Sequence, residues 1–219
     1  MDHLSPLEAI GLCSICLFVA YLVGSAISNP PTDTYADSNP FDQPESEEPE
    51  VEIATCIGHV RGQQLAKNAM LLAAMGRHNV LLIGPPGEGK SMIVGTMAGF
   101  LPPITPVERE ELREIYSVYG IPAPNHRPYR PIGPTITEAT LVGGGQRITP
   151  GEISLAHAGV LFMDELPEYP SKLIDKLRNP MEDNQVSITR GQQTRTYPCK
   201  FQLIAAMNPC SCGYYGYGP

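Results

Sequence analysis

Residues 84–91 read Gly-Pro-Pro-Gly-Glu-Gly-Lys-Ser and follow directly after an apolar run at residues 80–83. This is the G-x-x-x-x-G-K-[ST] pattern of a phosphate-binding loop, in the context that such a loop requires: a buried strand before it and a helix after it. The helix is expected at residues 92–100, where its positive amino end can face an anion. The pattern therefore predicts a strand–loop–helix unit that binds the phosphates of a nucleotide.

Each residue type in this loop has a physical task. Glycines at 84, 87 and 89 let the backbone turn tightly and aim its N–H groups at phosphate oxygens. Lys90 supplies a positive charge for the β- and γ-phosphates, and the Ser91 hydroxyl can bind Mg²⁺. The predicted nucleotide-binding residues are Gly84, Pro85, Pro86, Gly87, Glu88, Gly89, Lys90 and Ser91.

A second apolar run, at residues 159–163, ends in the carboxylates Asp164 and Glu165. In a phosphate-loop enzyme an Asp at this place holds the Mg²⁺ shell, and an adjacent Glu can activate the attacking water. Neighbouring residues on a strand point to opposite sides, so the two acids can have different tasks. We therefore predict a Mg²⁺ site formed by Ser91 and Asp164, with Glu165 as a catalytic residue.

A third apolar run, at residues 203–207, ends in Asn208. The amide of Asn208 could orient the water or contact the γ-phosphate, which would make it a second catalytic residue. It could equally cap the turn before Pro209, since Asn is common in turns. The local pattern alone favours the turn.

Apolar periodicity indicates an α/β fold from residue 53 onward. Helices are expected at 63–75, 92–100, 106–119 and 170–177, and strands at 80–83, 160–163, 203–207 and in a hairpin at 186–189 and 194–197. Leu65 and Leu72 should lie on the buried face of the first helix. Pro180 should end or kink the last helix, because proline removes a backbone donor. Short apolar strands separated by helices predict a parallel sheet that is covered on both faces.

The amino-terminal region has a different composition. Residues 9–27 contain no charged residue, and 19 residues of helix would span ~28 Å, close to the apolar thickness of a bilayer. A single-pass transmembrane helix is the first interpretation, with the ATP-binding domain in the cytoplasm because ATP is available there. A cleaved signal peptide and a docking helix are the alternatives.

Residues 29–52 carry eight acidic residues, five prolines and no Lys or Arg, which predicts a disordered, extended linker. The expected organisation is a transmembrane segment at 1–28, the linker at 29–52 and an ATP-binding core at 53–219. The core has 15 basic and 13 acidic residues, a formal charge of +2. This small excess does not by itself argue for nucleic-acid binding.

The segment before the two carboxylates is distinctive. Residues 150–168 read Pro-Gly-Glu-Ile-Ser-Leu-Ala-His-Ala-Gly-Val-Leu-Phe-Met-Asp-Glu-Leu-Pro-Glu. This segment resembles the magnesium chelatase-like (subunit I) branch of AAA+ ATPases, and within it the competence-associated ComM/YifB type. Three other blocks agree with the resemblance, which covers residues 53–217: Gly62-Gln63 with Ala66-Lys67, residues 141–145, and residues 205–210 with Gly213-Tyr214.

The resemblance implies a three-layer AAA+ P-loop core that binds ATP and Mg²⁺. Lys90 and Ser91 match Walker A, Asp164 and Glu165 match Walker B, and Asn208 matches sensor 1, a sensor of the γ-phosphate. The resemblance also implies a homo-oligomeric ring or a partner AAA+ subunit, and ATP-driven remodelling of a protein or DNA. It places residues 143–145 in an insert that could face the ring pore, and a plain flexible loop is the alternative.

The chain stops shortly after Asn208, at Pro219. Family members continue with a further strand, an arginine finger and a helical lid, so the core is expected to be incomplete at its carboxyl end. Three interpretations stay open: an ATPase that takes its finger and lid from another chain, a non-hydrolysing ATP-binding interaction module, and a truncated fragment of a ComM/YifB-type ATPase.

Overall fold

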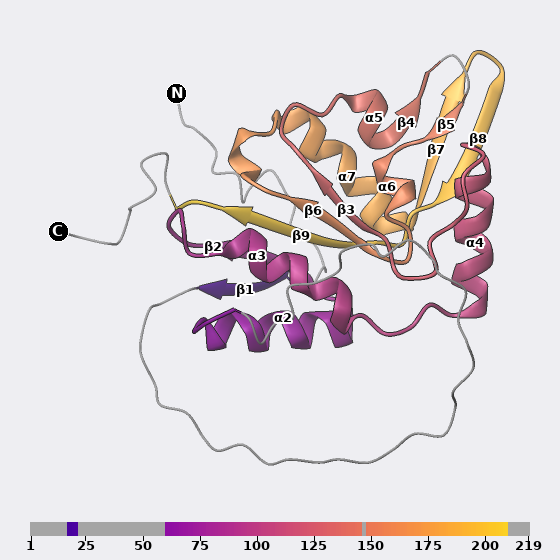
Figure 1. The fold of residues 1–219 in the computed structure, drawn as a ribbon. Coiled ribbons are helices and arrows are strands. Elements are labelled where there is room, and N and C mark those ends of the chain that lie inside the picture. The colour runs from indigo at the N-terminus through magenta and orange to yellow at the C-terminus, as the bar shows by residue number, and fades with distance from the viewer. Residues whose placement is uncertain (1–16, 22–59, 146–147, 210–219) are drawn as a thin grey trace, which may run out of the picture.

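A computed structural model describes residues 17–21, 60–145 and 148–209 (Figure 1). Its centre is a five-stranded parallel sheet in the order β1–β2–β9–β6–β3. The strands are β1 (Leu17–Tyr21), β2 (Asn79–Ile83), β3 (Tyr129–Ile132), β6 (Val160–Met163) and β9 (Gln202–Met207). The parallel sheet predicted from the apolar runs is confirmed, and the three runs form its adjacent strands β2, β9 and β6.

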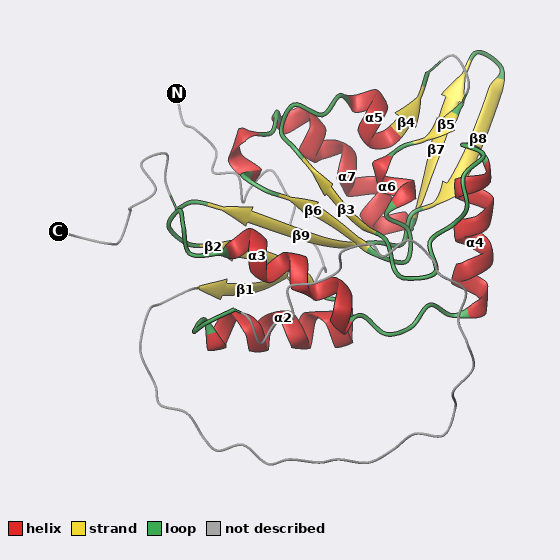
Figure 2. Ribbon diagram, in the orientation of Figure 1, coloured by secondary structure: helices red, strands yellow, loops and turns green. Residues whose placement is uncertain are grey.

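Helices cover both faces of the sheet (Figure 2). One face packs against α2 (Gln64–Gly76) and α3 (Lys90–Gly95), and the other packs against α4 (Pro106–Ser117), α6 (Glu152–Leu155) and α7 (Ser171–Asp183). Strand alternation separates the two cores: Val80 and Leu82 belong to the first, and Leu81 belongs to the second. Burial on both faces explains why these strands are continuously apolar.

Smaller elements complete the described structure. They are the 3₁₀ helices η2 (Thr96–Phe100) and η3 (Leu166–Glu168), the short helix α5 (Glu138–Val142), and two hairpins formed by β4 (Gly143–Gly144) with β5 (Thr149–Pro150) and by β7 (Gln185–Arg190) with β8 (Gln193–Pro198). The two hairpins lie side by side at one end of the molecule, where a Cβ atom on Gly143 would meet Ile188 of β7 (Figure 1).

Two expectations about the helices were wrong. Helix α7 does not end at Pro180 but continues to Asp183, since the proline removes only its own backbone donor, and Asn184 closes the helix in a left-handed conformation. In α2 the buried face is formed by Met70 and by alanines such as Ala66 and Ala73, while Leu65 and Leu72 are 60% and 56% exposed. The helix is apolar on both sides, so hydrophobicity alone does not mark its inner face.

The amino-terminal prediction also needs correction. Residues 17–21, inside the segment expected to form a transmembrane helix, form strand β1 and pair in parallel with β2. An uncharged run is compatible with either a membrane helix or a strand of a parallel sheet, and periodicity cannot separate them. No helix within the described ranges is long and apolar enough to cross a membrane. The rest of 1–28 and the linker at 29–52 lie outside the described residues.

Candidate nucleotide-binding site

The phosphate loop lies at the carboxyl end of β2, where the sequence placed it. The backbone N–H of Gly84 donates to the carbonyl oxygen of Met207 at 3.3 Å, which joins the start of the loop to the end of β9. Gly87 and Gly89 have φ angles of 83° and 75°, a region that side chains with a Cβ rarely adopt. Helix α3 begins at Lys90, so its amino end faces the loop.

Lys90 is buried, with 8% of its surface exposed. Its Nζ atom donates to the carbonyl oxygens of Gly84 at 2.8 Å and Pro85 at 2.9 Å, and to Oδ1 of Asn208 at 3.0 Å. Burial lowers the pKa of Lys90, and the carboxylates of Asp164, Glu88 and Glu165 act in the opposite direction. The ammonium group is thus held at the loop by neutral acceptors, ready for an anion.

Ser91 and Asp164 meet across the site. The Ser91 hydroxyl donates to Oδ2 of Asp164 at 2.6 Å, although the two residues are 73 positions apart in the chain. Hydroxyl and carboxylate oxygens are ligands that Mg²⁺ prefers, and Mg²⁺ sites in nucleotide enzymes commonly use one or two protein oxygens plus phosphates. The pair therefore fits the predicted metal site beside the phosphate loop.

Glu165 follows β6 in a left-handed conformation, with φ 53° and ψ 49°. Its backbone N–H donates to Oδ1 of Asp164 at 3.0 Å. A non-glycine residue in this region is uncommon, and such strain persists only where the surroundings enforce it. The left-handed residue follows the end of β6 at Met163 and starts the 3₁₀ helix η3.

Asn208 lies at the end of β9, partly buried, with its amide on Lys90. Three strand ends that are far apart in sequence thus come together, since β2, β9 and β6 are neighbours and all parallel. The alternative role of Asn208, as the cap of a turn, does not account for this contact. The structure brings together the ends of all three sequence patterns.

Sequence reasoning missed two features beside the site. Gln63, in a left-handed conformation just before α2, donates from Nε2 to Oε2 of Glu88 at 2.7 Å. Tyr129 stacks on Phe162 with ring centroids 6.2 Å apart, and burial together with Asp164 raises the pKa of Tyr129 to about 12. The sequence signal for Gln63 was the Gly62-Gln63 block. Tyr129 belongs to β3, which was not predicted as a strand because Pro131 interrupts its pattern.

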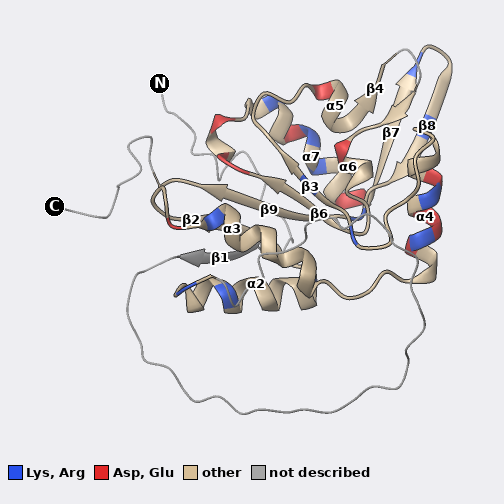
Figure 3. Cartoon of the chain, viewed as in Figure 1, with Lys and Arg blue, Asp and Glu red and all other residues tan. Residues whose placement is uncertain are grey.

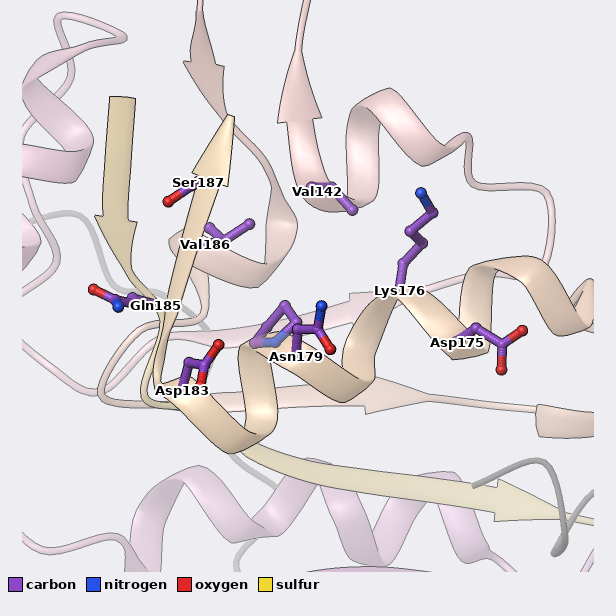
Figure 4. Close-up of a pocket in the computed structure, with 9 residues that line it drawn as sticks. Val142, Asp175, Lys176, Asn179, Asp183, Gln185, Val186 and Ser187 are labelled. Carbon is purple, nitrogen blue, oxygen red and sulfur yellow. The ribbon is translucent and has the colours of Figure 1, made fainter. Parts of the chain in front are cut away.

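A separate cavity of about 350 Å³ opens between α7, β7 and the end of α5 (Figure 4). Its lining includes Asp175, Lys176 and Asn179 of α7, and Lys176 forms an ion pair with Glu138 of α5 at 2.8 Å. None of the predicted site residues lines this cavity. Nor do the described residues hold a group of three or more His, Cys, Asp or Glu side chains that could bind a metal on its own.

The sequence matches the family model described as magnesium chelatase, subunit ChlI, over residues 56–218. The chain belongs to this family. The uncharacterized protein YifB of Salmonella typhimurium is 44% identical over 160 residues, and the competence protein ComM of Haemophilus influenzae is 44% identical over 158 residues. These matches cover 71% and 70% of this chain but 32% and 31% of the relatives, so the chain spans about a third of their length.

A solved assembly agrees at the level of the fold. In the complex between subunits BchI and BchD of magnesium chelatase, the similar chain has a TM-score of 0.55 and 23% identity, over 67% of this chain and 52% of that chain. This likeness supports an α/β core built on a parallel sheet. The membership of the ComM/YifB branch, inferred from residues 150–168, is confirmed by the two relatives.

Proposed function

We propose that this domain binds MgATP at the carboxyl ends of β2, β9 and β6. The observation that carries the proposal is a pair of contacts, Lys90 with Asn208 and Ser91 with Asp164. These contacts join the phosphate loop to the ends of β9 and β6. Gly84 to Ser91 would hold the phosphates, and Ser91 and Asp164 would hold Mg²⁺. The metal, when bound, neutralises charge on the phosphate oxygens.

Hydrolysis is the second part of the proposal. Glu165 is the carboxylate next to the metal pair, and it would accept a proton from the attacking water. Asn208 would contact the γ-phosphate and report whether it is present. In the described part of the chain, no arginine forms a hydrogen bond or ion pair with Lys90, Asp164, Glu165 or Asn208. We infer that an arginine for the transition state comes from another chain, which matters because such a group is worth ~10³ to 10⁵ in rate.

A ring or a partner AAA+ subunit would supply that arginine. The solved complex between subunits BchI and BchD of magnesium chelatase supports this part of the proposal. In such a ring the insert at residues 143–145 would face the pore.

The remodelled partner is proposed to be a protein or DNA. One observation bears on DNA: hairpin β7–β8 carries Arg190 and Arg195 and has no acidic residue between Gln185 and Pro198 (Figure 3). A change of both arginines to alanine would weaken binding to single-stranded DNA and flatten its salt dependence if the hairpin contacts phosphates. Unchanged DNA binding would favour a protein partner.

We place the site in the cytoplasm, where ATP is available. Membrane attachment through residues 9–27 would require residues 17–21 to leave the sheet, because they pair with β2. Fractionation of cells followed by alkaline extraction tests this: we expect the chain in the soluble fraction, and its retention in the extracted membrane pellet would restore the transmembrane prediction.

The decisive experiment for the proposed function is nucleotide binding by the full chain and two lysine variants. Lys90→Ala removes the buried ammonium and should abolish binding of a fluorescent ATP analogue. Lys172→Ala, which removes an exposed lysine on α7, is the matched control and should bind like the parent chain. If both variants bind the analogue equally well, the phosphate-loop assignment is wrong. If the parent chain binds ATP but releases no phosphate under any condition, the domain is a non-hydrolysing ATP-binding module.

A further inference from the structure

Strand β2, which carries the phosphate loop, has a neighbour on each side. β9 pairs Ile204–Met207 with Val80–Ile83 on one side. On the other side β1 pairs Leu17–Tyr21 with Asn79–Ile83, residue by residue and in parallel. Without β1, one side of β2 would present unpaired backbone donors and acceptors at the edge of the sheet.

The strand that covers this edge comes from outside the family domain. The family match begins at residue 56, whereas β1 ends at Tyr21. Thirty-eight residues, 22–59, connect β1 to the first described residue of the domain. Among the described strands, the neighbour of β2 at this edge is therefore a segment that lies outside the family match.

The sequence of β1 suits this place. It reads Leu-Phe-Val-Ala-Tyr, without charge, as expected for a strand of a parallel sheet. Its last residue, Tyr21, pairs with Ile83, which is the residue before Gly84 of the phosphate loop. β1 thus supports β2 along its whole length up to the loop.

We propose that the outer edge of β2 is a strand-binding site, that residues 17–21 occupy it in this chain, and that this occupation holds the phosphate loop in its binding conformation. The effect of β1 on the phosphate loop rests on the proposed function, whereas the effect of β1 on the stability of the fold does not. The same residues cannot also form a membrane helix, because a helix satisfies its backbone groups internally and β1 satisfies them on β2.

A pair of proline variants in the full chain tests the proposal, Val19→Pro and Ala20→Pro. Successive N–H groups of a strand point to opposite sides, so only one of these two faces β2. On an edge strand a proline is tolerated where the N–H faces away from the sheet. One variant should therefore lose the strand and lower the melting temperature by about 4 °C or more, while the other stays near the parent.

The variants serve as controls for each other, because they add the same residue to adjacent positions of an apolar run. Two variants that both melt like the parent would mean that β1 does not pair with β2. Two variants that are equally destabilised would point to a helix, in which either proline breaks the backbone ladder. Either result overturns the proposal.

Hydrogen exchange locates the effect. In the destabilised variant, amides of residues 79–83 that face β1 should exchange faster, while residues 160–163 on the far side of β9 stay protected. ATP-analogue affinity, measured on the same samples, should fall in that variant only. If even the parent chain binds no nucleotide, the proposed function fails, and the difference in melting temperature still decides whether β1 occupies the edge.

Discussion

The Nζ atom of Lys90 lies 3.0 Å from the Oδ1 atom of Asn208, which is 118 residues further along the chain. An ammonium group has three donors, and the other two of Lys90 go to the carbonyl oxygens of Gly84 and Pro85. An incoming phosphate must therefore replace at least one of these acceptors. Because Asn208 follows a different strand, a γ-phosphate bound as proposed would act on the end of β9 if it displaced this amide.

The first prediction concerns the preference for ATP over ADP. Asn208→Ala should weaken binding of a non-hydrolysable ATP analogue roughly tenfold relative to ADP, because a hydrogen bond to a charged group is lost. Asn208→Asp should weaken ATP further, since its added negative charge faces the phosphates. Calorimetry with both nucleotides measures the ratio, and Asn179→Ala on α7 is the control. A ratio unchanged in all three variants would remove Asn208 from the site.

The second prediction separates binding from hydrolysis. Glu165→Gln keeps the shape of the side chain and removes its basicity, so ATP binding should stay near the parent value while phosphate release falls by about 10² to 10⁴. Glu168→Gln, an exposed acid three residues away, should leave both unchanged. Turnover needs to be measured at high protein concentration, where neighbouring chains can complete the site. Retained turnover in Glu165→Gln would assign the base elsewhere.

The third prediction concerns Mg²⁺. The Ser91 hydroxyl and Asp164 carboxylate are 2.6 Å apart, so loss of either should remove the part of ATP affinity that depends on Mg²⁺. For the parent chain, adding a chelator should weaken ATP binding; for Ser91→Ala and Asp164→Asn the chelator should have little further effect. Asp175→Asn in α7 should respond like the parent. A full chelator response in Asp164→Asn would contradict the assignment.

The sequence was sufficient to place a strand where the strand is buried on both faces and ends in site residues. Strand β6 was placed at residues 160–163 because a strand buried on both faces must be apolar and its end carries the two acids. The short elements could not be placed from the pattern. β3 is half polar, with Arg130 and Pro131 in its middle, and Arg130 is only partly buried, where Glu152 of α6 pairs with it at 2.6 Å. That compensation is a tertiary contact, which no local pattern reveals.

The structure differs from the prediction for the amino-terminal segment for another reason. Residues 17–21 have no charge, which satisfies a membrane helix and a parallel strand equally, and only the exposed edge of β2 decides between them. The role of Asn208 at the site is likewise not determined by its local sequence. Its local sequence favours a turn, and only the alignment of β9 beside β2 brings its amide to Lys90.

The fourth prediction concerns Gly159, the residue before β6. A Cβ atom at this position would lie 2.0 Å from the carbonyl oxygen of Pro128, far inside any normal contact. Gly159→Ala should therefore push β3 from β6 and destabilise the domain by about 3 kcal/mol or more. Gly95→Ala is the control, because its added Cβ meets nothing within 4 Å. Chemical denaturation of both variants measures the difference, and equal stabilities would contradict the packing of β3 on β6.

The last prediction starts from the carboxylate of Glu108, which holds three segments together. It caps α4 by accepting from the backbone N–H of Thr105 at 2.9 Å, and it forms ion pairs with Arg77 at 2.9 Å and Arg127 at 3.0 Å. Arg127 is itself buried and also donates to the carbonyl oxygens of Pro103 and Ala158. The network ties the start of α4 to the end of α2 and to the segment before β6.

Burial by itself would raise the pKa of Glu108, but Arg127, Thr105 and Arg77 outweigh it and lower the pKa to about 2 from 4.5. A carboxyl group with a lowered pKa in the folded state stabilises the fold above its unfolded pKa, and this stabilisation is lost as the pH falls. Stability should therefore decrease between about pH 4.5 and pH 2, by up to roughly 3 kcal/mol. Glu108→Gln should be less stable at pH 7 and should lose much of this dependence, whereas Glu110→Gln, in an exposed pair, should keep it. Urea unfolding of the three chains at pH 7, 4.5 and 3 makes the comparison, and parallel pH profiles for Glu108→Gln and the parent would show that the network does not depend on this charge.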